Sequence, residues 1–183
     1  MATVIGGMIM SLDGFVNDRD GSVGRLYPDM EAMRETELLQ EAMRTTGAVL
    51  MGRHAYDMAN GDFTGYEFQV PIFVVTHHPP EQAAKGENEN LTFTFVSDGF
   101  ESAVKQAKAA AGDKDVTVVG GASTIQQLLK ARLLDELQID VAPVLLGDGL
   151  RLFEHLEGLE IELEKIKAIE SPFGTHFHFR VVK

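Results

Sequence analysis

The organising stretch of this chain reads Val49-Leu50-Met51-Gly52-Arg53-His54-Ala55-Tyr56. An apolar run typical of a buried strand ends at a glycine, and a guanidinium and an imidazole follow it directly. Glycine lets the backbone approach an anion, while the next amides and cationic side chains supply hydrogen-bond donors. Two interpretations stay open from this stretch alone: a phosphate-binding corner, or a plain strand-to-helix turn with two surface cations.

Two other apolar runs end in a similar way. Residues 70–76 are followed by two histidines, and residues 116–119 are followed by the glycine pair Gly120 and Gly121. Ligands of parallel sheets bind beyond the carboxyl ends of the strands, so these ends converge on one site if the strands are neighbours. The glycine pair is not the GxGxxG fingerprint of Rossmann folds, yet glycines before a helix start still make an anion site.

Buried strands and amphipathic helices alternate through the first two thirds of the chain. The longer helices are predicted over residues 28–46, 98–111 and 125–131, with apolar strands before and between them. This alternation predicts an α/β fold with a central, mostly parallel sheet flanked by helices on both faces. Strand patterns around a hairpin turn at residues 171–174 add a C-terminal antiparallel hairpin, which makes the sheet mixed.

Length and composition indicate a single globular domain over residues 1–183. The formal net charge of −12 argues against binding to nucleic acid or to an anionic membrane, because their phosphates would be repelled. No apolar run approaches the ~20 residues of a membrane span, and no signal peptide is evident. The absence of cysteine fits a cytoplasmic location.

Other catalytic chemistries find little support in the sequence. The serines lack a GxSxG nucleophile elbow, so a hydrolase triad is not expected. His176 and His178 share one face of the last predicted strand, but a third metal ligand is not evident. We therefore interpret that face as a polar outer surface and expect no metal site.

Three stretches together resemble the dihydrofolate reductase-like superfamily: residues 51–56, 118–122 and 11–14. The nearest branch is the RibD C-terminal one, the reductase domain of bacterial bifunctional riboflavin-biosynthesis deaminase-reductases. Residues 143–149, with Leu152-Phe153 after them, also resemble that branch. The likeness runs in order along nearly the whole chain, down to the closing hairpin.

The resemblance implies an NADPH-dependent reductase, with cofactor contacts at the strand ends. By position, the phosphates would meet Gly52, Arg53 and His54, and the adenosine 2′-phosphate side would meet Thr76 and His77. The residues that would hold the pyrophosphate are Gly120, Gly121, Ala122, Ser123 and Thr124. The Gly120–Gly121 peptide among them would be strained or cis. The loop from Ser11 to Ser22, with Gly14 in its turn, would close over the nicotinamide as a lid.

The resemblance also suggests two proton donors. Dihydrofolate reductases place a carboxylate in the helix after the lid, which points to Asp29, and the riboflavin branch points to Asp13. Shielding by the lid would raise the pKa of either carboxyl group. The structural alternatives are a turn former for Asp13 and a helix-start charge for Asp29.

The predicted function is NADPH-dependent hydride transfer to a pteridine-like (dihydrofolate-type) or pyrimidinone-like heterocycle, a small-molecule substrate. One alternative is the riboflavin-pathway 5-amino-6-(5-phosphoribosylamino)uracil reductase, although the zinc deaminase half that accompanies it is lacking here. The other is a non-catalytic nucleotide-binding module of the same fold. The riboflavin branch also implies a homodimer.

Overall fold

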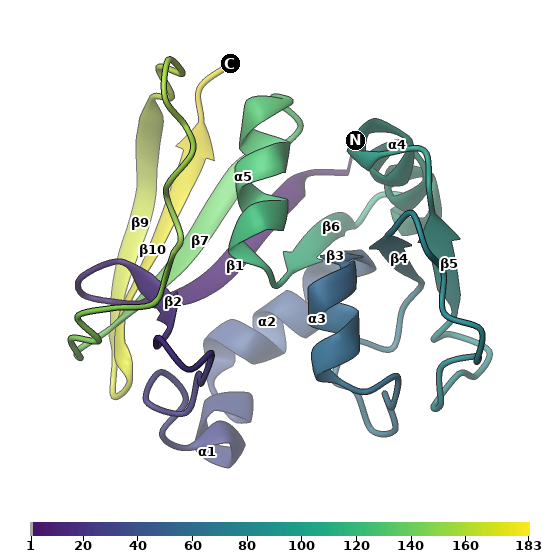
Figure 1. The fold of residues 1–183 in the computed structure, drawn as a ribbon, viewed down its shortest axis with the longest axis horizontal. Helices are drawn as coiled ribbons and strands as arrows, with labels where there is room; N and C mark the ends of the chain where they lie inside the picture. Colours follow the sequence, from purple (N-terminus) through teal and green to yellow (C-terminus); the bar gives the residue numbers. More distant parts are fainter. Residues whose placement is uncertain (1) are drawn as a thin grey trace.

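The central strand β3 (Thr46–Gly52) shows why a buried sheet forms here. Its side chains alternate between two cores: Ala48 and Leu50 pack on one face of the sheet, and Val49 and Met51 on the other. A strand that is apolar on both faces is stable only when helices cover both of them. The computed structural model, which describes residues 2–183, has this arrangement (Figure 1).

Within residues 2–183, eight strands form one sheet in the order β5-β4-β3-β6-β1-β7-β10-β9 (Figure 1). The first six are parallel, whereas β10 is antiparallel to both β7 and β9. The expected mixed, mostly parallel sheet with a C-terminal antiparallel hairpin is therefore confirmed. The strands are β1 Val4–Ser11, β3, β4 Ile72–Val75, β5 Phe93–Val96, β6 Asp115–Val119, β7 Glu136–Ala142, β9 Leu163–Ser171 and β10 Gly174–Val181.

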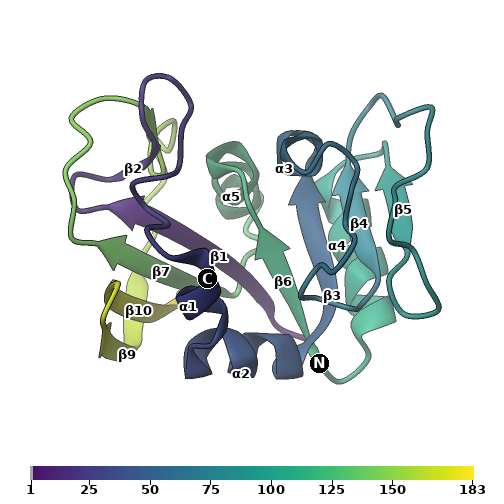
Figure 2. The same cartoon turned by 90° about the horizontal axis from the view of Figure 1, so that it is seen from below.

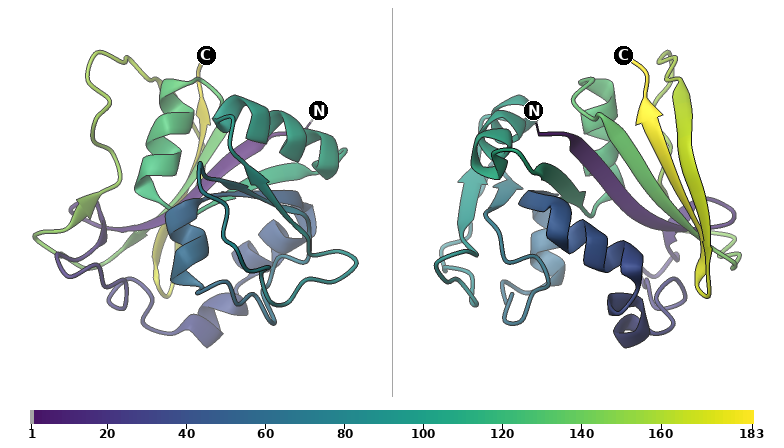
Figure 3. Two further views of the ribbon diagram at one scale, coloured as in Figure 1. Left: turned by 45° about the vertical axis from the view of Figure 1, so that its right-hand side comes forward. Right: turned by 180° about the vertical axis from the view of Figure 1, so that it is seen from behind.

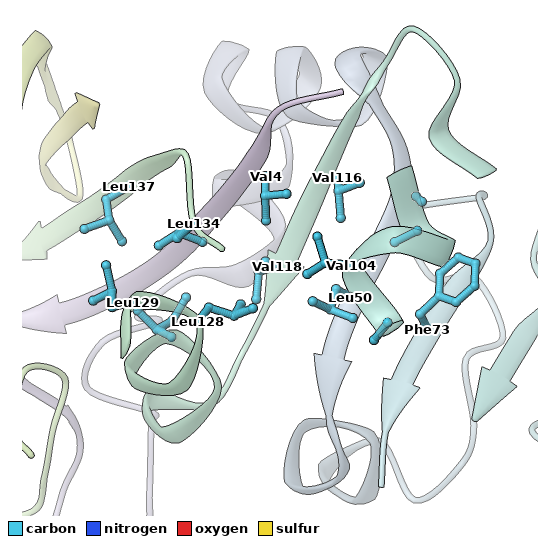
Figure 4. Packing of buried hydrophobic residues seen from close by; sticks show 14 of the residues in the cluster. Val4, Leu50, Phe73, Val104, Val116, Val118, Leu128, Leu129, Leu134 and Leu137 are labelled. Atoms are coloured by element: carbon cyan, nitrogen blue, oxygen red, sulfur yellow. The ribbon is translucent and has the colours of Figure 1, made fainter. Parts of the chain in front are cut away.

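Helices cover the sheet from opposite sides. The larger core joins the strands to α4 (Phe100–Ala111) and α5 (Ala122–Lys130), and Figure 4 shows part of its packing. The smaller core uses the other face, where α2 (Glu37–Thr45) and α3 (Arg53–Met58) contribute side chains. In Figure 2 the strands run between α5 and the pair formed by α2 and α1 (Met30–Arg34).

Gly6 in β1 explains how closely α5 packs on the sheet. A Cβ atom at Gly6 would lie 2.8 Å from Ile125 Cδ1 and 3.1 Å from a methyl group of Leu134. Real Cβ atoms essentially never come within 3.0 Å of another atom, so any larger residue here would force the Ile125 side chain of α5 to shift. Close helix-to-sheet packing, rather than a bulge, accounts for this glycine.

The single helix expected over residues 28–46 is wrong. Two helices, α1 and α2, lie there, and each has its own N-cap. Asp29 Oδ1 accepts from Ala32 N at 2.9 Å, and Thr36 Oγ1 accepts from Leu39 N at 3.4 Å. Because a capping side chain favours a helix start at its own position, Thr36 divides a sequence whose apolar stripe is continuous.

The segments around the expected lid form a second, small sheet. Strand β2 (Phe15–Asn17) pairs antiparallel with β8 (Leu150–Arg151). Arg151 also places its guanidinium carbon 4.4 Å from the centre of the Phe15 ring, a cation–π contact. In the described part of the chain, no helix is long and apolar enough to span a bilayer.

Candidate active site

The carboxyl ends of β4, β3 and β6 lie side by side because these three parallel strands are neighbours in the sheet. Their ends carry Thr76, Gly52 and Gly120, the positions at which the sequence predicted converging groups. The structure therefore brings the three predicted corners to one edge of the sheet. This edge is the usual ligand site of open α/β sheets.

Thr124 is the point at which two of these corners touch. A Cβ atom at Gly52 would lie 2.5 Å from Thr124 Oγ1, and one at Gly121 would lie 3.2 Å from the same atom. Gly120 and Gly121 both have positive φ, at 76° and 84°, a conformation that side chains disfavour. Of the two options for their peptide, the cis form is not observed: residues 2–183 contain no cis peptide bond.

The N-terminus of α5 offers free hydrogen-bond donors at this edge. Gly121 is its N-cap and has no side chain to cap the helix. The backbone amides of Ala122 and Ser123 donate to no other group within residues 2–183. Uncapped amides at a positive helix end fit a pyrophosphate, so the residues here suit the dinucleotide that the sequence predicted.

Arg53 connects two of the strand ends. Its Nε lies 2.7 Å from Asp57 Oδ1, and its Nη1 donates to the carbonyl of His78, just beyond β4. The buried Thr76 shapes the same turn, because its hydroxyl accepts from the His78 amide at 3.2 Å. His54 and His77 are exposed beside them. Cationic and imidazole groups thus gather locally on an acidic protein.

Asp13 does not have the expected raised pKa. Its carboxylate accepts from Ser11 Oγ at 2.6 Å, Gly147 N at 2.8 Å and Leu146 N at 3.1 Å. The Ser11 hydroxyl has the largest effect on this group, and together with the two amides it outweighs desolvation and lowers the pKa of Asp13 to about 2. The Asp13 carboxylate therefore stabilises the contact between two loops. Because it is ionised at neutral pH, it holds no proton to donate.

The loop after β1, which was expected to be a lid, is fixed by hydrogen bonds at its start. Leu12 N donates to Val144 O at 2.9 Å, and Phe15 N donates to the buried Ser11 hydroxyl at 2.9 Å. Gly14 has a φ of 88°, and its carbonyl accepts from Leu152 N at 3.0 Å. Ser11 and Gly14 thus shape the turn that carries Asp13.

Asp29 lies on the surface at the start of α1. Its side chain is exposed and accepts a hydrogen bond from Ala32 N, so it caps the helix. This is the helix-start role that the sequence offered as the alternative to a proton donor. It does not line the neighbouring cavity. Asp29 is therefore not shielded from solvent in this structure.

A cavity of about 320 Å³ lies next to the strand ends, between the sheet and the α1–α2 pair. In Figure 3 (right), which shows the molecule from behind, α2 lies in front of the sheet and α1 lies below it. Gly120 lines the end of the cavity nearest the three corners. The opposite wall is apolar and comes mainly from Leu26, Met30, Met33 and Leu39.

The floor of the cavity is unexpectedly polar. Gln138 and Asp140 project from β7, and His176 projects from the neighbouring β10. His176 Nδ1 lies 2.9 Å from Asp140 Oδ1. Tyr27 lines the cavity as well; burial, and then the negative charge of Asp140, raise the pKa of its hydroxyl.

Sequence reasoning missed these polar residues, because it interpreted the face of His176 and His178 as outer surface. The alternation of Leu137, Ile139 and Val141 with polar residues in β7 was the available signal. It identifies two faces of a strand but does not tell which one a helix pair will roof over. No three His, Asp or Glu side chains within residues 2–183 lie close enough to hold a metal ion.

The comparisons with known proteins decide the family. The model of the RibD C-terminal domain matches residues 2–173. The chain belongs to the RibD C-terminal domain family. The chain is also similar to the uncharacterised protein YwjB of Bacillus subtilis (strain 168), with 26% identity over 172 residues, which cover 92% of each chain.

Solved structures show the fold of this RibD C-terminal domain. A putative riboflavin biosynthesis protein from Shewanella sp. PV-4 superposes with a TM-score of 0.81 at 24% identity, over 100% of both chains. Dihydrofolate reductase from Enterococcus faecalis, in a complex with NADP(H) and RAB-propyl, reaches a TM-score of 0.61 at 13% identity. That match covers 99% of this chain and 97% of the other. The fold is dihydrofolate reductase-like, as expected.

Proposed function

We propose that this protein is an NADPH-dependent reductase of a flat nitrogen heterocycle, pteridine-like or pyrimidinone-like. One observation carries the proposal: three neighbouring strand ends meet at one edge of the sheet, where the first amides of α5 are unpartnered and Gly120 lines a cavity. NADPH, when bound, would supply the hydride. Membership of the RibD C-terminal domain family supports a reductase rather than another use of the fold.

The chain's own residues would bind and orient the two ligands. The amides of Ala122 and Ser123 would hold the pyrophosphate, and Arg53 would add positive charge from the β3 end. Thr124 packs against Gly52 and Gly121, so it would keep the two corners in register. The apolar wall from α1 and α2 would cover one face of the heterocycle and exclude water.

The riboflavin-pathway reductase is the second candidate. The family and the name of the Shewanella structure favour it. Its substrate would bring a ribose phosphate in addition to the ring, so it needs a further anion site. Arg34 lines the cavity and is the cationic side chain that could meet such a phosphate.

Thermal unfolding with nucleotides, followed by a turnover assay, tests the proposal. NADPH at about a hundred times its Kd should raise the Tm by about 5–10 °C, more than NADH at the same concentration. Absorbance at the reduced nicotinamide band should then fall when dihydrofolate or the riboflavin-pathway pyrimidinone is added. Strong NADPH binding without oxidation by any heterocycle would favour a binding module. If neither nucleotide raises the Tm, both hypotheses are wrong.

A further inference from the structure

A cross-strand pair on the cavity floor joins an imidazole to a carboxylate. His176 on β10 lies directly opposite Asp140 on β7, with 2.9 Å between Nδ1 and Oδ1. The His176 side chain is only 6% exposed, whereas that of Asp140 is 44% exposed. Packing therefore fixes the imidazole, and the carboxylate stays open to the cavity that both residues line.

The second ring nitrogen of His176 is available to a ligand. Nε2 makes no hydrogen bond to any group within residues 2–183. Within residues 2–183, the side-chain nitrogen that is fully buried and has no hydrogen-bond partner is His178 Nδ1. His176 Nε2 also has no partner but is not fully buried, so part of its surface is accessible to solvent. Because His176 lines the cavity, we take that contact to be with the cavity.

We propose that His176, oriented by Asp140, gives the proton that completes reduction of the heterocycle, an inference that rests on the proposed reductase function. A ring C=N that gains a hydride on carbon must also gain one proton on nitrogen. The hydride of NADPH carries both electrons, and NADP⁺ remains. The proton leaves Nε2 of the doubly protonated imidazole, whose nitrogen keeps the N–H electron pair, and the neutral ring regains a proton from water.

The other polar groups of the cavity indicate which rings fit. Tyr27, Arg34 and Glu67 are the remaining titratable or charged side chains that line it. The raised pKa of Tyr27 keeps its hydroxyl protonated, so it can donate to a ring carbonyl. Gln138 offers a donor and an acceptor together. These groups match the alternating N–H and C=O edge of a pteridine or a pyrimidinone.

His178 provides a matched control on the same strand. It lies two residues from His176 and also pairs with a carboxylate, since its Nε2 is 2.6 Å from Glu136 Oε2. It does not line the cavity, and its Nδ1 is enclosed. The two histidines thus differ in access to a ligand, while strand, face and type of partner are shared.

Nitrogen NMR of the full chain, labelled with [¹⁵N]histidine and amide ¹⁵N, tests the assignment without turnover. Folate and uracil serve as probes of the pteridine and pyrimidinone classes. At least one of them should move the Nε2 signal of His176 and leave both His178 nitrogens unchanged. Asp140→Asn should weaken binding of that probe about tenfold. If neither probe moves the His176 signal, the inference is overturned.

The same samples separate this inference from the proposed function. NADPH should shift the amide signals of Gly120 and Gly121. If those amides respond while His176 ignores both probes, the proton donor is wrong and the nucleotide site stands. If His176 responds while the glycine amides ignore NADPH, the reductase proposal fails and the ring site stands.

Kinetics with the full chain then test the proton itself. In single turnover with NADPH and saturating heterocycle, His176→Gln should slow oxidation about 10²–10⁴-fold and flatten its pH profile. His178→Gln should stay within about twofold of the unmodified protein, because its side chain lies outside the cavity. A His176→Gln variant that keeps the original rate and pH profile would overturn the proposal.

Discussion

A carboxylate that accepts three hydrogen bonds is committed to structure rather than to proton transfer. Asp13 receives donors from Ser11, Leu146 and Gly147, and it joins the loop after β1 to the segment before β8. His176 is the opposite case, because one of its nitrogens is held and the other is available. At the scale of single residues, hydrogen-bond partners therefore separate the structural acid from the candidate proton donor.

Replacing Asp13 by Asn should remove a pH-dependent part of the stability. The pKa of Asp13 falls from 3.8 to about 2 on folding, so its contribution is complete above about pH 4 and is lost as pH falls toward 2. Urea midpoints of the unmodified protein should exceed those of Asp13→Asn at pH 5, and the difference should shrink at pH 3. A difference that is constant from pH 5 to pH 3 would contradict the assigned hydrogen bonds.

Replacing Arg53 by Ala should weaken NADPH binding about 10–100-fold, since a charge-assisted phosphate contact is worth roughly 1.5–3 kcal/mol. A larger loss for NADPH than for NADH would place Arg53 at the 2′-phosphate, and an equal loss at the pyrophosphate. Arg44→Ala, at an exposed position in α2, makes the same change in net charge and is the control. Equal effects of both substitutions on Kd, measured by titration calorimetry, would mean that Arg53 makes no specific contact.

At the scale of elements, the site depends on how two strand-to-helix turns touch. The turn from β3 into α3 and the turn from β6 into α5 meet at Thr124. Gly52 has a φ of −81° and a ψ of 165°, so an alanine there would suffer no backbone strain. Its Cβ would still lie 2.5 Å from Thr124 Oγ1, which makes the contact purely steric.

Gly52→Ala should therefore lower the free energy of unfolding by about 1–3 kcal/mol, and Thr124→Ala should relieve much of that loss in the double variant. Gly24→Ala, whose Cβ would meet only Ser22 Oγ at 3.6 Å, is the control. The double-mutant cycle compares urea unfolding of the unmodified protein, the two single variants Gly52→Ala and Thr124→Ala, and the double variant. Strictly additive effects would show that the two turns do not press on each other.

Asp29 belongs to the same scale, because it caps α1 at the edge of the cavity roof. Asp29→Ala should cost about 1 kcal/mol in unfolding free energy, whereas Asp29→Asn should cost much less, since asparagine caps equally well. Both free energies come from chemical unfolding. The Asn variant should also keep its rate of NADPH oxidation. A rate loss of about 100-fold or more would restore Asp29 as the proton donor and count against His176.

At the scale of the whole molecule, local patterns predicted what depends on local chemistry. The apolar runs before Gly52, Thr76 and Gly120 carried enough information to place the three corners at neighbouring strand ends. The roof of the cavity could not be predicted in the same way. The break at Thr36 lies inside a continuous apolar stripe, and the alternation around Asp140 and His176 is the same for an outer face and for a covered one.

The most direct test of the central claim is a crystal structure of the protein with NADPH bound. The proposal predicts the pyrophosphate on the amides of Ala122 and Ser123, with the nicotinamide ring at the Gly120 end of the cavity that reaches His176. It would be contradicted by NADPH bound elsewhere on the molecule, or by no bound nucleotide in crystals grown at millimolar NADPH.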